Sequence, residues 1–193
     1  MKKWMPMTAL TTCGLLGLFL VAASGTYRTA RAADGDNKMQ STRADFKEFC
    51  QAMQGRWIGE VIWITDWPGF GKKGDKVTAY SDFRISHNGH VLLGRFNGGP
   101  GAGTGMVHYD AGKRQIQARW VSSGGSVWNQ VIYKQDGLWH ELETGSVADG
   151  KPIRSSLVRH ISDDGKTHRR SGTVKIDGKM VDPVRDVWRR IGD

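Results

Sequence analysis

The residues best suited to binding a metal ion are two histidines that flank a short turn. His87 and His90 occur in the segment His-Asn-Gly-His, so their imidazole rings can approach each other across a hairpin. Imidazole pairs bind zinc and copper. Two ligands at an exposed turn are nevertheless too few for a structural zinc site, which needs four. We therefore predict no metal site.

A glycine-rich segment, Phe96 to Asp110, raises the question of phosphate binding. A Walker loop needs a lysine directly after its last glycine and a helix beyond it, because the helix N-terminus holds the phosphates. Here Met106 follows Gly105, and Met106 also takes the place of the third glycine of a dinucleotide-binding pattern. The residues Gly98 to Gly105 therefore predict a flexible connection between two strands, which could cover a cavity as a lid.

The sequence also contains no recognisable motif for nucleophilic or acid–base catalysis. The chain has no Gly-x-Ser-x-Gly segment, and Cys50 has no evident base beside it. Asp163 and Asp164 lie on an expected turn, where carboxylates are usually solvated, and no carboxylate pair suits glycoside hydrolysis. We predict no catalytic residue and no cofactor, and the sequence favours a protein that is not an enzyme.

The N-terminus has the pattern of an export signal. Two lysines precede a nine-residue apolar run, Leu15–Ala23, and Ala30–Ala32 offers small residues where a signal peptidase cleaves. A membrane-spanning helix would need about 20 apolar residues. We predict a signal peptide at residues 1–32, with cleavage after Ala32 or, alternatively, after Ala23. The protein is then exported, and is periplasmic or secreted.

Charge and cysteine content limit the partners of the exported chain. Residues 1–32 hold four basic residues and no acid, so their removal lowers the net charge from +9 to +5. The remaining basic residues are scattered or paired, which argues against nucleic-acid binding. Weak contact with an anionic envelope polymer or membrane surface stays open. Cys13 leaves with the signal peptide, and Cys50 is expected to be buried.

One short amphipathic helix is expected at residues 41–54, after a polar lead at 33–40. Phe46, Phe49, Cys50 and Met53 follow the i, i+3, i+4, i+7 spacing of one helix face. Thr42 and Asp45 have the spacing of a capping box.

From residue 55 onward, short runs rich in Val, Ile, Trp and Tyr are separated every 8 to 12 residues by turn signals such as Asp-Gly and Asn-Gly. This spacing indicates consecutive antiparallel hairpins. We expect about ten strands, which begin near residues 55, 77, 90, 105, 114, 126, 138, 152, 167 and 180. Closing them into a barrel removes exposed sheet edges. The predicted fold is a mostly β, single antiparallel up-and-down β-barrel domain at residues 41–193, including the helix.

Alternation along the strands predicts which side chains face the barrel interior. The candidate ligand-binding residues on the expected inner face are Phe83, Trp120, Asn129, Tyr133, His140 and Arg159. A polar group inside must pair with another group, with water or with a ligand. If the phase of a strand is displaced by one residue, the same side chains point outward.

The segment Gly-Arg-Trp at residues 55–57, preceded by a short helix, resembles the start of the calycin superfamily, which includes lipocalins, fatty-acid-binding proteins and nitrobindins. Further motifs at Leu92–Phe96, Gly105–Asp110 and the terminal Trp-Arg-Arg are most similar to the bacterial DUF1579 family of uncharacterised, often exported proteins. The resemblance implies a closed barrel. It also implies that Trp57 packs under Arg189 or Arg190, a contact that closes the barrel through a cation–π interaction.

The same resemblance raises an alternative. Nitrobindin-like proteins bind haem through a histidine on a late strand, and His160 and His168 lie in that part of the chain. However, Val61 and Trp63 replace a glycine and a tyrosine of the nitrobindin opening motif.

We therefore expect a non-enzymatic exported barrel that binds or carries a small lipophilic ligand in an apolar cavity. Two alternatives remain open at this point. The first is a barrel enzyme or haem-binding protein, and the second is a module that interacts with an envelope polymer or an anionic surface.

Overall fold

The computed structural model describes residues 39–193. The predicted signal peptide, both candidate cleavage sites and residues 33–38 of the polar lead lie outside the described residues.

The N-terminal helix α1 spans Arg43–Met53 and begins with the expected capping box. The Thr42 hydroxyl accepts a hydrogen bond from the Asp45 backbone at 3.1 Å, and the Asp45 carboxylate accepts one from the Thr42 backbone at 2.6 Å. The predicted apolar face is buried, and burial raises the pKa of the Cys50 thiol to about 12. No helix in the described part of the chain has the length and apolar character needed to cross a membrane.

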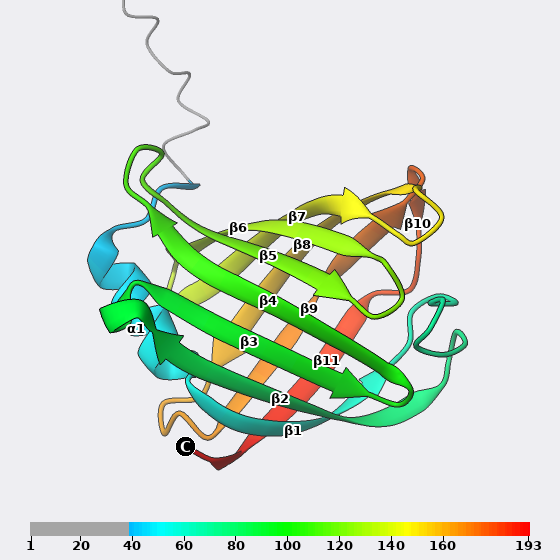
Figure 1. The fold of residues 1–193 in the computed structure, drawn as a ribbon, viewed down its shortest axis with the longest axis horizontal. Coiled ribbons are helices and arrows are strands. Elements are labelled where there is room, and N and C mark those ends of the chain that lie inside the picture. The colour runs from blue at the N-terminus through cyan, green and yellow to red at the C-terminus, as the bar shows by residue number, and fades with distance from the viewer. Residues whose placement is uncertain (1–38) are drawn as a thin grey trace, which may run out of the picture. The chain divides into compact units, whose positions relative to one another are not determined.

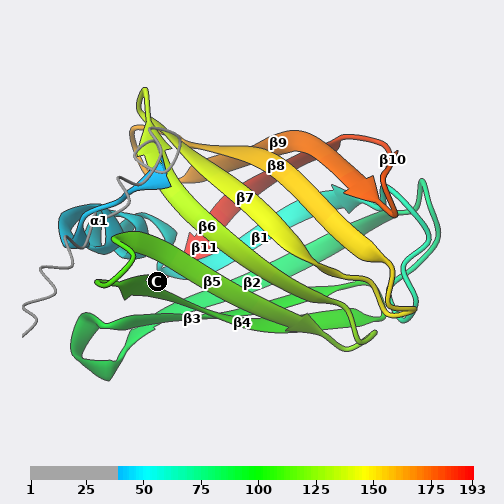
Figure 2. The ribbon, with the colours of Figure 1, turned by 90° about the horizontal axis from the view of Figure 1, so that it is seen from above.

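Ten long antiparallel strands form a closed barrel, which confirms the predicted fold (Figures 1 and 2). Each strand pairs with the next from β1 to β9, and β11 lies between β9 and β1. The two-residue strand β10 pairs only with β9. The strands are β1 Gly55–Ile62, β2 Lys76–Ser86, β3 Val91–Gly98, β4 Gly101–Asp110, β5 Gln115–Ser122, β6 Val127–Gln135, β7 Leu138–Ser146, β8 Pro152–Ile161, β9 Thr167–Ile176, β10 Lys179–Met180 and β11 Val184–Gly192.

The last long strand starts later than the sequence pattern indicates. Lys179 and Met180 turn back onto Ile176 and Lys175 of β9, and the chain then continues to β11 at Val184. A short 3-10 turn, η2 at His87–Gly89, joins β2 to β3.

The prediction of a flexible connection over Gly98 to Gly105 is wrong. Only Gly99 and Pro100 separate β3 from β4, and the following glycines are part of β4. A Cβ atom at Gly105 would overlap the indole of Trp120, and one at Gly101 would overlap the ring of Phe70. These glycines therefore make room for aromatic rings inside the barrel, as a strand glycine does where another group approaches closely.

The two ends of the barrel are covered differently. Helix α1 lies at one end, where the ring of Phe49 packs edge-on against Trp139 (Figure 2). The long β1–β2 connection, residues 63–75, lies at the opposite end and packs against the turns that join β3 to β4 and β5 to β6.

Arg190, and not Arg189, packs over Trp57. The guanidinium lies 4.3 Å from the centre of the indole and donates hydrogen bonds to the carbonyl of Ala52 at 2.8 Å and of Gly165 at 3.0 Å. The indole Nε1 donates to the Met53 carbonyl at 2.9 Å. Arg189 is exposed on the outer face. Arg190 therefore joins the helix end to the first and last strands of the barrel.

Candidate functional site

A cavity of about 240 Å³ lies inside the barrel. Aromatic side chains from several strands and from the 63–75 connection form much of its wall. They pack mainly edge to face, as Trp63 does on Phe70 at 5.3 Å and Phe83 on Trp120 at 6.0 Å. The aromatic lining consists of Phe49, Trp63, Trp67, Phe70, Phe83, Phe96, Trp120, Trp128 and Trp188.

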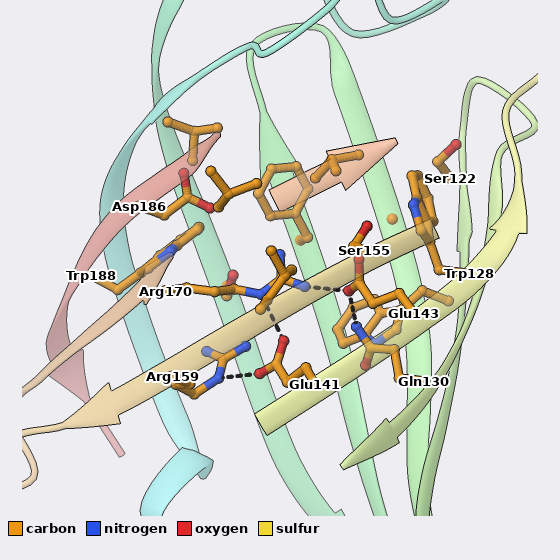
Figure 3. Close-up of a pocket in the computed structure, with 18 of the residues that line it drawn as sticks. Ser122, Trp128, Gln130, Glu141, Glu143, Ser155, Arg159, Arg170, Asp186 and Trp188 are labelled. Carbon is orange, nitrogen blue, oxygen red and sulfur yellow. Dashed lines mark hydrogen bonds and ion pairs between the residues drawn. The ribbon is translucent and has the colours of Figure 1, made fainter. Parts of the chain in front are cut away.

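One side of the cavity is polar and charged, and its residues come from β6, β7, β8, β9 and β11 (Figure 3). Glu141 is only 1% exposed and accepts hydrogen bonds from Arg159 Nε at 2.6 Å and from Arg170 Nε at 2.7 Å. Glu143 accepts from Gln130 Nε2 at 2.5 Å and from Arg170 Nη2. Arg170 therefore bridges both glutamates.

The charges of this network are held by their partners. Burial alone would raise the pKa of Glu141, but the guanidiniums of Arg159 and Arg170 lower it to about 2. Burial opposes the charge on Arg170, and the carboxylates of Glu141 and Glu143 outweigh that effect and raise its pKa. Both partners are thus ionised across the whole neutral range.

His168 lies beside this network and is neutral. Its ring is 2% exposed, meets Trp57 edge-on at 4.6 Å and stacks on Trp188 at 5.8 Å. Nδ1 lies 3.1 Å from Nη1 of Arg159. The same arginine nitrogen lies 3.5 Å from Nε2, and because a guanidinium can only donate, the nearer Nδ1 is the better placed acceptor. Burial and the nearby arginines, Arg159 foremost, push the pKa of His168 far below its usual value.

Asp186 is the third carboxyl group on this side of the cavity. It makes no hydrogen bond or ion pair within residues 39–193. Burial raises its pKa to about 6, although the positive charges of Arg170 and Arg159 act in the opposite direction. With all groups ionised, the three carboxylates Glu141, Glu143 and Asp186 face two guanidiniums, so one negative charge is in excess.

Two further polar atoms in the cavity wall have no partner within the part of the chain that the structure describes. They are the hydroxyl oxygen of Ser155 and the indole Nε1 of Trp63. Ser155 is 7% exposed and Trp63 8% exposed. A buried polar group that is left unpaired costs about 1 to 3 kcal/mol. Both atoms are covered by their neighbours, and Trp63 Nε1 packs against Gly71 of the same connection, so a ligand in the cavity can bond to them only if those neighbours move.

The structure brings only half of the predicted ligand-binding residues into the cavity. Phe83, Trp120 and Arg159 line it. The expected inward orientation of Asn129, Tyr133 and His140 is wrong. Asn129 is exposed, and the rings of Tyr133 and His140 stack on each other at 5.1 Å on the outer face.

The cause is a one-residue displacement of the phase along β6 and β7. Apolar residues such as Val131 and Leu142 suggested the inner face, but Gln130, Glu141 and Glu143 occupy it. The missed signal was electrostatic. Arg159 was correctly expected inside, and a buried guanidinium requires carboxylate partners on neighbouring strands.

The candidate metal and haem ligands are not arranged for those roles. His90 Nδ1 lies 3.2 Å from Nη1 of Arg43, and no group of three or more metal-binding side chains occurs among the described residues. His160 is exposed on the outer face. His168 is enclosed by two indoles and faces a guanidinium, a cation that would repel an iron ion. The site residues therefore do not fit a haem group.

Comparisons with known proteins leave the family open. No model of a protein family matches the chain, and no curated protein matches it. One similar solved structure is that of a "putative outer membrane protein" from Bacteroides fragilis NCTC 9343. It is 8% identical, the match covers 74% of this chain and 99% of that chain, and the TM-score is 0.23. A likeness at this level supports no inference about function.

Proposed function

We propose that this protein is an exported, non-enzymatic barrel that binds or carries a small lipophilic molecule in its cavity. The observation that carries the proposal is a cavity that combines an aromatic wall with one polar, charged side. Small-molecule sites are typically concave and apolar, with a few polar groups that fix the orientation of the ligand.

The size of the cavity limits the ligand. Cavities for drug-sized molecules are about 300 to 1,000 Å³, and this one measures about 240 Å³. It suits a small molecule, such as one built on one or two aromatic rings or on a short aliphatic chain. Flat aromatic ligands can make the same edge and face contacts that the indoles and phenylalanine rings of the wall make with each other.

The outer surface of the barrel differs from this interior. Outward-facing strand positions carry exposed arginines, among them Arg56, Arg84, Arg95, Arg119, Arg154 and Arg189. The aromatic side chains are concentrated inside, so apolar binding energy is available in the cavity. The basic exterior supports weak contact with an anionic envelope polymer or membrane surface as a further part of the proposal.

Export and a calycin-like relationship also belong to the proposal. The basic start, the apolar run Leu15–Ala23 and the small residues at Ala30–Ala32 support export. The helix before β1 and the packing of Arg190 over Trp57 support a calycin-like barrel.

Titration with prodan, a neutral naphthalene dye whose emission shifts to the blue when it leaves water, tests the binding function. We expect a saturable blue shift with transfer of excitation from the cavity tryptophans. Gly103→Leu should weaken binding about tenfold or more, because Gly103 lines the cavity and has room for a side chain there.

Thr104→Leu is the matched control, since Thr104 is the next residue of β4 and is exposed on the outer face. Both variants should retain the far-ultraviolet circular dichroism of the parent. Linear, non-saturating emission changes, or equal binding by both variants, would contradict a ligand site inside the barrel.

A further inference from the structure

The polar side of the cavity has an unequal number of positive and negative groups. Arg159 and Arg170 are already engaged by Glu141 and Glu143, at distances of 2.6 to 2.7 Å for the pairs to Glu141. Asp186 has no such partner within residues 39–193. The excess charge therefore resides on one carboxyl group that lines the cavity.

The number of charged groups indicates which charge a ligand must carry to balance this network. An acidic ligand would raise the excess from one negative charge to two in a medium of low dielectric constant, which is costly. A neutral ligand would leave the excess as it is. A cationic ligand group would cancel it, and a desolvated charge is favourable only when it is paired.

Geometry places the unpaired groups close to the same ion pair. Asp186 is the cross-strand partner of Arg170, and Ser155 is the cross-strand partner of Glu143. Figure 3 shows Asp186 and Ser155 flanking the Arg170 side chain. Ser155 is more than nine-tenths buried, and its hydroxyl oxygen, which can accept a hydrogen bond, has no partner in the described chain.

The aromatic wall begins beside Asp186. Trp188 lies two residues farther along β11, on the same inward face, and its ring packs edge-on against Phe96 at 6.0 Å. Indole faces attract ammonium groups as well as apolar bodies. A cation held at Asp186 would thus have its hydrocarbon part directed toward aromatic rings.

We propose that the cavity selects small lipophilic primary amines, which bind as ammonium ions beside Asp186 with the apolar part against the aromatic wall. This inference rests on the proposed function and specifies the ligand class of the same site.

The charge state of Asp186 makes amine binding depend on pH. Because burial raises the pKa of Asp186 to about 6, its charge is largely lost at pH 5 and present at pH 7.5. The groups that face it are Glu141 and Glu143 from β7, Arg159 from β8, and His168 and Arg170 from β9. The pKa of Glu141 lies far below this range, that of Arg170 lies far above it, and His168 is neutral throughout. Amine affinity should therefore rise between pH 5 and pH 7.5.

Calorimetric titration of the mature protein with three probes of similar shape tests the inference: 2-phenylethylamine, 2-phenylethanol and 3-phenylpropanoate. At pH 7.5 we expect the amine to bind about tenfold or more tighter than the alcohol, and the acid to bind most weakly. Asp186→Asn should remove the advantage of the amine and leave the affinity for the alcohol within about threefold.

Glu60→Gln is the matched control. Glu60 is exposed on β1 and is the cross-strand partner of Val187, so the substitution removes a carboxylate from the outside of the barrel near Asp186. It should leave the preference for the amine unchanged. Saturable prodan binding by both variants, together with an unchanged circular dichroism spectrum, verifies that the cavity is intact.

The outcomes separate the two proposals. Equal affinity for amine and alcohol, preference for the acid, or an amine preference that survives Asp186→Asn would overturn the amine inference. Prodan binding without binding of any of the three probes would overturn it as well, while a ligand site in the barrel would stand. If neither prodan nor any probe binds, the proposed function fails together with the inference.

Discussion

The two sides of the barrel interior are built on different physical principles. On the side formed by β2 to β5, aromatic rings pack directly onto glycines, and Trp120 fits over Gly94 and Gly105. On the side formed by β7, β8, β9 and β11, carboxylates and guanidiniums are bonded to each other. The first side is held by close packing and the second by charge pairing in a dry environment.

The comparison also bears on whether the charged side serves to stabilise the fold or to recognise a ligand. A buried ion-pair network is often no more stabilising than apolar side chains of the same volume, because desolvation offsets the attraction. The aromatic side shows that this barrel can fill its interior with apolar groups. The presence of a charged network on one side only, with Asp186 left over, therefore suggests a role in recognition, as the amine proposal states.

The largest effect is expected from breaking the charged side. Glu141→Gln removes the buried carboxylate that is paired directly with both Arg159 and Arg170. We expect a loss of about 3 to 5 kcal/mol in the free energy of unfolding, measured by urea denaturation at pH 7. Glu60→Gln, which changes an exposed glutamate, should shift the same value by less than about 0.5 kcal/mol. A similar small shift for Glu141→Gln would show that the network contributes little.

Glu141 also makes the contribution of the charged side to stability depend on pH. Its pKa is lowered in the folded state from 4.5 to about 2, so its contribution is fully present above pH 4.5 and is lost as the pH falls toward 2. The stability of the parent protein should decline over this interval. The stability of the Glu141→Gln variant should decline less over the same interval. Equal declines in the parent and the variant would indicate that other carboxylates control acid unfolding.

The packed side should respond to the addition of one methyl group. Gly105→Ala places a Cβ atom into the indole of Trp120 and should cost about 1 to 3 kcal/mol. Gly103→Ala is the control on the same strand and the same face, because its Cβ atom would meet no atom closer than 3.5 Å. Thermal unfolding of the two variants measures the difference, and equal midpoints would argue against close packing around Trp120.

A smaller effect of opposite sign is expected at Asp186. The raised pKa means that the folded protein disfavours the ionised form, so stability is lost as the pH rises from about 4 to about 6. Asp186→Asn should therefore stabilise the protein by about 1 to 2 kcal/mol at pH 8 and have almost no effect at pH 4. Urea denaturation at both pH values measures this, and destabilisation at pH 8 would show that the carboxylate has a structural partner.

The smallest effects are expected on the outer face. Asn129→Ala should change stability by less than about 0.5 kcal/mol, and His140→Ala should lose about 0.2 to 1 kcal/mol from its stacking on Tyr133. Neither substitution should change prodan affinity. A clear loss of prodan binding in either variant would contradict the orientation that the structure gives to β6 and β7.

Local signals in the sequence were sufficient for the elements of this fold. The capping box at Thr42 and the apolar spacing of α1 depend only on neighbouring residues, and the Asp-Gly turns mark hairpins for the same reason. For this reason the helix, the number of long strands and most strand starts were predicted correctly. The start of β11 and the glycine segment of β4 were not predicted correctly. In the case of β4, a glycine that makes room for a distant aromatic ring cannot be distinguished in the sequence from a glycine in a loop.

The sequence by itself determined a barrel of about ten antiparallel strands after one helix, since strand length, turns and alternation are properties of adjacent residues. Only the tertiary structure decided which face of β6 and β7 points inward, because both faces of these strands mix polar and apolar residues. The same is true of the site. Glu141 and Asp186 are separated by 45 positions in the chain, and barrel closure brings their strands to one side of a shared cavity.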